Sequence, residues 1–222
     1  VFCTEPLQYT SLAHLFFANC DRENFAGWSH RKHGKWINFT GRRLRRETQY
    51  LALAFRARGL VAGKSIGVVA ESSPEWIMAD VAAQLNQAKV VPLFPNISAE
   101  NFNYQCDDAS VQVLVLNMLS DLDPAIGALM PRFNAVICID KKSELPPNGV
   151  YWEDLVKEGE MLSRMPESSL WLNQQMHSLN PDDVFSILYT RGSTGVPKGV
   201  ELTHRNMLSQ IQVIKRDFLR LS

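Results

Sequence analysis

The chain has 222 residues and equal numbers of basic and acidic side chains, so its formal net charge is zero. A neutral chain has no global field that would attract nucleic acid, and we expect no nucleic-acid partner. Its hydrophobic content of 45% is ordinary for a globular protein, and no apolar run approaches the length that a membrane-spanning helix needs.

Four cysteines lie far apart in the sequence and form no C-x-x-C pair. This usage favours a reduced protein, and we expect a cytoplasmic location. The chain starts at Val1 rather than Met and shows no signal-peptide pattern, so we expect a fragment whose original start is missing.

Residues 1–40 are predicted to form an opening segment. A short helix is expected over Ser11–Phe17, with Ser11 or Thr10 as its cap, and the alternating stretch 35–39 favours a strand. Thr40 then caps a helix that ends near Gly59.

Seven Lys and Arg residues, and no acidic residue, occur between His30 and Arg46. One interpretation is a solvated face. The other is peripheral contact of residues 28–46 with an anionic membrane surface, with Trp28, Trp36 and Phe39 at the headgroup level.

From residue 65 onward, short apolar runs alternate with helical patterns. Strands are predicted at 66–70, 89–94, 111–116, 135–139 and 184–188. Helices are predicted at 74–87, from Ser98, within 119–130, at 151–162 and after Asn206. The proline in 89–94 indicates a position near a sheet edge or a strand end. Residues 141–149 are expected to be a loop, and 163–181 an unpatterned connection.

Alternation of strands and helices predicts an α/β fold, with a mainly parallel sheet that is covered by helices on both faces. We divide the chain into the opening segment 1–40, α/β units at 41–183, a loop with its flanking strands at 184–206, and the start of a helix at 207–222.

The stretch from Tyr189 to Val200 carries the clearest chemical signal. Glycines let a backbone turn and approach a ligand, while Ser and Thr hydroxyls, backbone N–H groups and a Lys ammonium bind phosphates. The pattern G-x-x-x-x-G-K-[ST] does not fit, because Pro197 stands where its second glycine would be. An ordinary surface turn would not need this combination of residues.

The same stretch resembles the phosphate loop of the adenylate-forming, or AMP-binding, superfamily, written Y-T-S-G-T-T-G-x-P-K-G-V. Arg191 departs from it, because the superfamily has a small residue there. The matching residues are Thr190, Gly192, Thr194, Gly195, Pro197, Lys198 and Gly199, and Ser193 is a conservative change. The stretches 74–80 and 91–100 resemble bacterial long-chain acyl-CoA synthetases, so the resemblance covers roughly residues 36–210.

The resemblance implies an N-terminal part of the large domain of an acid–thiol ligase. Such an enzyme forms an acyl-adenylate from a fatty acid and ATP, with Mg²⁺, and then an acyl-CoA with coenzyme A. Lys198 is the implied catalytic residue. The implied nucleotide-binding residues are Thr190, Arg191, Gly192, Ser193, Thr194, Gly195 and Lys198. The adenine, Mg²⁺ and acyl sites, and also the C-terminal domain, would lie beyond this chain, so no metal ligand is named.

Two alternatives stay open. One is another adenylating ligase of the aryl-acid, peptide-synthetase or luciferase type, and the other is a non-catalytic module that binds a nucleotide or a membrane. Arg191 is expected either to touch the polyphosphate or to pair with a carboxylate such as Glu201. The other candidates are interpreted as structural: His30 and His33 as solvated, Asp107-Asp108 and Asp182-Asp183 as turn and cap residues, and His204 as a cap or packing residue.

Overall fold

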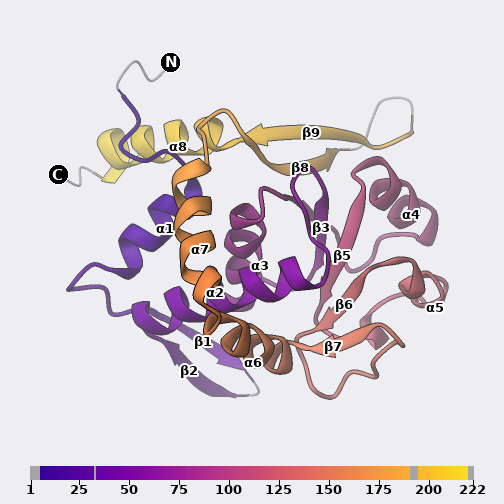
Figure 1. Cartoon of the computed structure of the whole chain (residues 1–222). Helices are drawn as coiled ribbons and strands as arrows, with labels where there is room; N and C mark the ends of the chain where they lie inside the picture. Colours follow the sequence, from indigo (N-terminus) through magenta and orange to yellow (C-terminus); the bar gives the residue numbers. More distant parts are fainter. Residues whose placement is uncertain (1–5, 33, 191–194, 220–222) are drawn as a thin grey trace.

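The computed structural model describes residues 6–32, 34–190 and 195–219 (Figure 1). The α-helices are α1 (Leu12–Cys20), α2 (Gly41–Ala57), α3 (Pro74–Leu85), α4 (Ala99–Asp108), α5 (Pro124–Gly127), α6 (Trp152–Ser163), α7 (Pro166–Ser178) and α8 (His204–Val213). Short 3₁₀ turns at Leu119–Asp121 and Met130–Arg132 flank α5, and a π-helix at Ile214–Leu219 follows α8.

The strands are β1 (Trp28–Lys32), β2 (Lys35–Phe39), β3 (Ser65–Val69), β4 (Lys89–Pro92), β5 (Val111–Leu116), β6 (Ala135–Cys138), β7 (Gly149–Tyr151), β8 (Val184–Thr190) and β9 (Lys198–Thr203). Strands β1 and β2 form a separate antiparallel hairpin. The others form a seven-stranded sheet in the order β7-β6-β5-β3-β4-β8-β9. All neighbours in this sheet are parallel except β8 and β9.

Helices cover both faces of the sheet, which confirms the predicted α/β class. One buried cluster joins the sheet to α1, α2, α3, α6 and α7, and a second joins the opposite face to α4 and α5. Figure 1 shows the first group on the left of the sheet and the second on its right. Because both faces are covered, a strand such as β3 is buried along its whole length and reads as a continuous apolar run.

Side chains at the helix starts explain where the helices begin. Ser11, Thr40, Ser73 and Ser98 each accept a hydrogen bond from the backbone N–H three residues later. Such a bond satisfies one of the free N–H groups of the first helical turn and typically contributes about 1 kcal/mol. The sequence predicted Thr40 as a cap and Ser11 as one of two candidates, and the structure confirms both.

Two parts of the local structure differ from the sequence-based prediction. Residues 163–181 contain α7, whose side chains are mostly exposed, so its sequence lacks a clear apolar stripe. The polar strand β1 and the three-residue strand β7 were not predicted. The helix predicted within 119–130 is the four-residue α5. The proline of 89–94 marks a strand end, as one of its two predicted positions, because Pro92 ends β4 inside the sheet between β3 and β8.

The hairpin and the start of α2 hold the basic residues of the stretch 28–46. Phe39 is buried, so its predicted place at a membrane headgroup level is wrong. Trp28 packs against Phe16 with 5.8 Å between ring centroids, whereas Trp36 is 68% exposed.

Two of the four arginines in the first two turns of α2 form ion pairs within the protein. Arg43 pairs with Glu47, and Arg45 pairs with Asp21. Arg42 and Arg46 are exposed. In the part of the chain that the structure describes, no helix is both long enough and apolar enough to cross a bilayer.

Candidate phosphate-binding site

The antiparallel pair β8–β9 frames the candidate site. Thr190 is the last residue of β8, Lys198 is the first residue of β9, and the two are partners across the ladder. Both side chains are exposed. A hydroxyl and an ammonium group therefore stand side by side where the two strands meet the loop.

The loop itself is described in part. Gly195 has a φ of +85°, a left-handed conformation that glycine adopts without strain. A side chain there would have open space, so backbone conformation is the reason for glycine at this position. The predicted nucleotide-binding residues Arg191, Gly192, Ser193 and Thr194 lie outside the described residues.

Tyr189, the residue before Thr190, fixes the end of β8 to helix α4. Its hydroxyl donates a hydrogen bond of 2.6 Å to Oδ2 of Asp108, and its ring meets Tyr104 edge to face with 6.3 Å between centroids. Burial, and then the Asp108 carboxylate, raise the pKa of the Tyr189 phenol. The phenol therefore stays protonated and keeps its proton on this bond.

Gly199 lies opposite Tyr189 on β9. A Cβ at Gly199 would lie 2.9 Å from Cγ2 of Ile187 and 3.3 Å from the ring of Tyr189. Only glycine lets β9 approach the Tyr189 ring this closely. No packing role for Tyr189 or Gly199 was predicted from the sequence, although a tyrosine and a glycine on facing strands are a signal for such packing.

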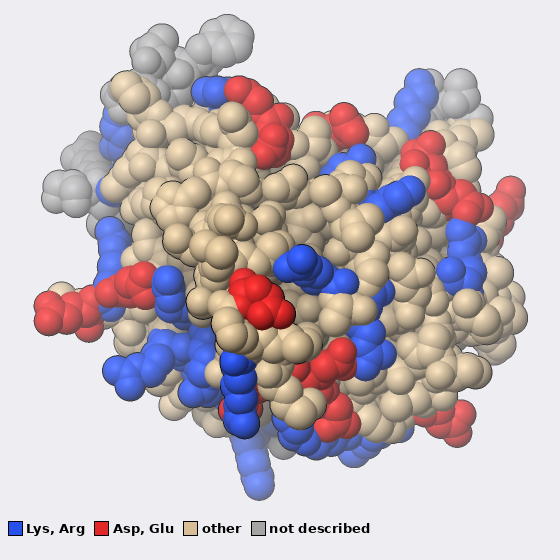
Figure 2. All heavy atoms as spheres, in the orientation of Figure 1, with Lys and Arg blue, Asp and Glu red and all other residues tan. Residues whose placement is uncertain are grey.

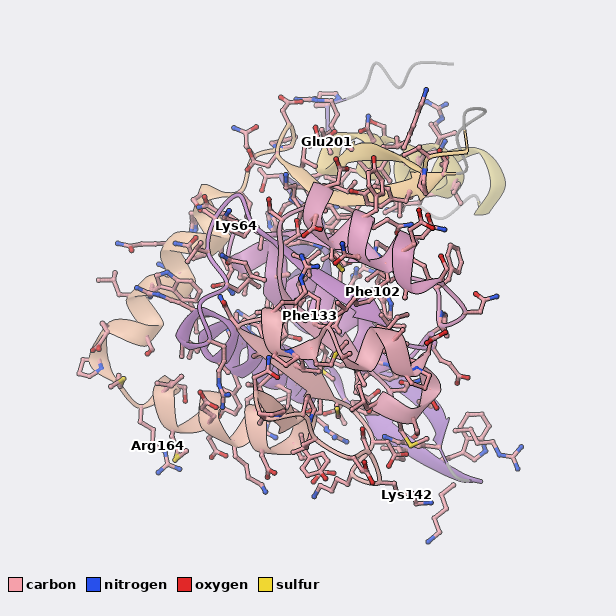
Figure 3. The ribbon with its side chains drawn as sticks, turned by 90° about the vertical axis from the view of Figure 1, so that its right-hand side faces the viewer. Lys64, Phe102, Phe133, Lys142, Arg164 and Glu201 are labelled. Atoms are coloured by element: carbon pink, nitrogen blue, oxygen red, sulfur yellow. The ribbon has the colours of Figure 1, made fainter. Side chains whose placement is uncertain are left out.

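Glu201, two residues further along β9, was considered as a partner of Arg191. Its carboxylate lies 3.8 Å from the ammonium of Lys89, at the start of β4, so it already has a cationic neighbour. The Arg191 side chain is outside the described residues, and its pairing stays a prediction. Figure 3 shows Glu201 at one end of the molecule and Lys142, which follows β6, at the other.

His204 begins α8 and is buried, with an exposed fraction of 1%. Its Nδ1 accepts a hydrogen bond of 3.2 Å from the backbone N–H of Leu12, and its ring stacks on Phe185 at 5.3 Å. Burial lowers the pKa of His204 to about 4. A neutral, enclosed imidazole that joins α1 to α8 is a packing residue, as expected.

The paired aspartates also have structural partners. Asp107 pairs with Arg132, and Asp182 with Arg205. Asp183 accepts the backbone N–H of Asn180 in the turn before β8. Cys20, Cys106 and Cys138 are buried free thiols, and Cys3 lies outside the described residues. Among the residues that the structure describes, no three His, Cys, Asp or Glu side chains gather into a possible metal site.

Comparison with known proteins decides the family. A sequence model of the family described as AMP-binding enzyme matches residues 18–221. The chain belongs to the AMP-binding enzyme family. The resemblance seen in the loop is thus confirmed over nearly the whole sequence, and the family consists of adenylate-forming ligases.

The curated relatives that match the chain include fatty acyl-CoA ligases and, as a second kind of protein, tyrocidine synthase 3. The chain is 27% identical over 176 residues to a long-chain-fatty-acid–CoA ligase of Xenopus laevis, a match that covers 78% of the chain and 23% of that protein. It is 29% identical over 188 residues to fatty acyl-CoA synthetase A of Dictyostelium discoideum, covering 80% of the chain and 26% of that protein. It is also 30% identical over 173 residues to tyrocidine synthase 3 of Brevibacillus parabrevis, covering 78% of the chain and 2% of that protein.

Solved structures of this family share the fold. A Brucella canis acyl-CoA synthetase superposes with a TM-score of 0.69 at 15% identity, covering 96% of the chain and 37% of that structure. A fatty acyl-adenylate ligase from L. pneumophila, in complex with acyl adenylate and pyrophosphate, superposes with a TM-score of 0.68 at 17% identity; this match covers 99% of the chain and 35% of that structure. The chain spans about a quarter of the length of the long-chain ligases that it matches.

Proposed function

We propose that the chain is the phosphate-binding part of a ligase that activates long-chain fatty acids with ATP and then transfers the acyl group to coenzyme A. The observation that carries this proposal is the cross-strand pair of Thr190 and Lys198 at the base of a glycine-bearing loop. The names of the long-chain relatives support a fatty-acid substrate. The match to a peptide synthetase keeps an amino-acid substrate as the alternative.

In this proposal the chain's own residues grip the triphosphate of ATP. The Thr190 hydroxyl donates to a phosphate oxygen, and the turn at Gly195 lets backbone N–H groups approach. The Lys198 ammonium balances charge that develops on the leaving pyrophosphate. Arg191, Gly192, Ser193 and Thr194 are proposed to complete the grip.

Mg²⁺ would reach this site together with the nucleotide. The described side chains around β8 and β9 include no set of carboxylates that would hold the ion by itself. The donors here are a hydroxyl, an ammonium and backbone N–H groups, which suit phosphate rather than a cation. When bound, Mg²⁺ supplies further charge compensation on the phosphates.

The proposal can be tested with the Lys198→Ala variant of a protein that has the full length of the relatives. Its activity is measured as fatty-acid-dependent ATP–pyrophosphate exchange. Removing one preorganised charge donor typically costs about 3–4 kcal/mol of transition-state stabilisation, so we expect a loss of about 10²–10³-fold. The matched control is Lys142→Ala, an exposed lysine at the opposite end of the molecule (Figure 3). Unchanged exchange in Lys198→Ala, or an equal loss in both variants, would remove Lys198 from the mechanism.

We also propose a cytoplasmic location with peripheral contact to an anionic membrane. Figure 2 shows Lys and Arg side chains gathered at the lower left of the displayed face, where Figure 1 places the hairpin and the start of α2. Trp36 is exposed beside them. An enzyme whose substrate partitions into bilayers would gain from binding there.

A further inference from the structure

A cavity of about 390 Å³ lies at the carboxyl ends of three neighbouring parallel strands. Glu71 follows β3, Asn117 follows β5 and Asp140 follows β6. Arg31 and Lys32 of β1 line it from the hairpin side. No residue of β8 or β9 is among its described lining residues.

The strand order makes this edge of the sheet a natural place for a ligand. The chain leaves β3 through α3 on one face of the sheet, and it leaves β5 through α5 on the other. Because β3 and β5 are neighbours, their connections diverge and a crevice opens between their carboxyl ends. In open α/β sheets, ligands bind at such a switch point.

Glu75 in the first turn of α3 is the second observation. The residue is 8% exposed and lines the cavity, and its Oε2 has no hydrogen-bond partner. A carboxylate is favoured at a helix N-terminus by the helix dipole. A buried polar atom without a partner is nonetheless rare, because it loses its bonds to water and gains none in return.

A second cavity, of about 520 Å³, adjoins the first. Glu75 and Lys32 line both of them. The second cavity extends between the hairpin and α6, where Phe39, Trp152 and Val156 contribute apolar lining. Four basic and four acidic side chains also line the second cavity, so its charges balance, and Glu75 stands where the two cavities meet.

The balance of charge defines what would bind. The first cavity is lined by four carboxylates against two cationic side chains: Glu71, Glu75, Asp121 and Asp140 against Arg31 and Lys32. Among the described residues these carboxylates do not form a group that could hold a metal ion. We infer that the first cavity, where carboxylates are in excess, binds an organic ammonium ion, whose N–H groups donate to Glu75 while its alkyl chain extends toward Trp152 in the second cavity.

This site is independent of the proposed adenylation chemistry. Its lining comes from the strand ends of β3, β5 and β6 and from the hairpin, whereas the phosphate site lies on β8 and β9. Lys142, two residues after Asp140, and Glu201 of β9 lie at opposite ends of the view in Figure 3. Either proposal can therefore fail without the other.

The test compares hexylammonium, hexanoate and hexanol, which share one alkyl chain and differ in charge, as ligands of the 222-residue chain. We expect hexylammonium alone to raise Tm, increasingly with concentration, because binding to the folded state adds to stability. Glu75→Gln keeps the shape and removes the charge, and it should abolish this rise. The control Glu160→Gln, which changes an exposed carboxylate of α6 outside both cavities, should keep it.

A second measurement needs no variant. In a ¹⁵N–¹H titration of the wild-type chain, hexylammonium should shift the amides of Ser73, Asn117 and Ile139, which line the first cavity. Three results would each overturn the inference: no rise of Tm in the wild-type chain, an equal rise with hexanol, or an undiminished rise in Glu75→Gln. Amide shifts confined to other regions would overturn it as well.

Discussion

At the scale of single residues, the site depends on neighbours that have no phosphate chemistry of their own. Tyr189 ties β8 to α4 through Asp108, and Gly199 lets β9 lie against the Tyr189 ring. These contacts hold Thr190 and Lys198 at one level of the ladder. The packing behind the proposed phosphate site therefore fixes the positions of Thr190 and Lys198.

His204 gives a prediction for stability against pH. Its folded pKa of about 4 lies below the ordinary value of 6.5, so the unfolded chain binds more protons between these values. The contribution of His204 to stability is thus present above pH 6.5 and is lost as the pH falls toward 4, by at most about 3 kcal/mol. Urea unfolding at several pH values would measure it.

Asp80 acts in the opposite direction in the same range. Burial raises its pKa to about 6, so its contribution is lost as the pH rises from about 4 to 6. The free energy of unfolding of the wild-type chain will therefore change little with pH over this range. The informative quantity is the difference in free energy of unfolding between the wild type and His204→Gln. As the pH falls, the wild type should lose stability relative to the variant. A difference that does not change between pH 7 and 4 would contradict the assignment.

At the scale of elements, the β1–β2 hairpin carries charge that the fold does not need. Lys32 and Lys35 stand directly opposite each other, and Trp36 faces Arg31 across the ladder. Like charges directly opposite destabilise a strand pair. A negative surface would relieve this repulsion at the exposed end of the hairpin, whereas Arg43 and Arg45 of α2 are already paired with Glu47 and Asp21.

We expect the hairpin to provide the membrane contact. Changing Arg31 and Lys35 to Gln together with Trp36→Ala should abolish flotation of the chain with anionic liposomes at low salt, since each basic residue near such a surface contributes about 1 kcal/mol. Arg43→Gln with Arg45→Gln is the matched control, because these arginines pair within the protein. Equal flotation of parent and hairpin variant, or none by the parent, would refute the contact.

At the scale of the whole molecule, the chain carries the residues of the proposed phosphate site and the sheet behind them. It spans about a quarter of the length of the long-chain relatives. We expect the 222-residue chain alone not to form an acyl-adenylate, because the adenine and acyl sites implied by the family would lie outside it. Exchange of pyrophosphate into ATP by the purified chain, dependent on fatty acid and above a Lys198→Ala control, would contradict this expectation.

The sequence by itself determined the fold class, the helix caps at Ser11 and Thr40, and the family. These features depend on local chemistry: an apolar run for a strand buried on both faces, a hydroxyl for a free N–H, and an ordered set of residues for the loop. It missed α7 and β1 because exposed or polar elements lack an apolar pattern. It misplaced Phe39 because the same residue fits a core or a membrane surface equally well.

Only the tertiary structure decided which distant residues meet. The Tyr189–Asp108 bond joins residues 81 positions apart, and the contact of His204 with Leu12 joins residues 192 apart. The Glu75 cavity depends on the order of strands in the sheet and on the hairpin that faces it. Such contacts arise from how packed layers bring chain segments together, and no periodicity or spacing along the sequence records that arrangement.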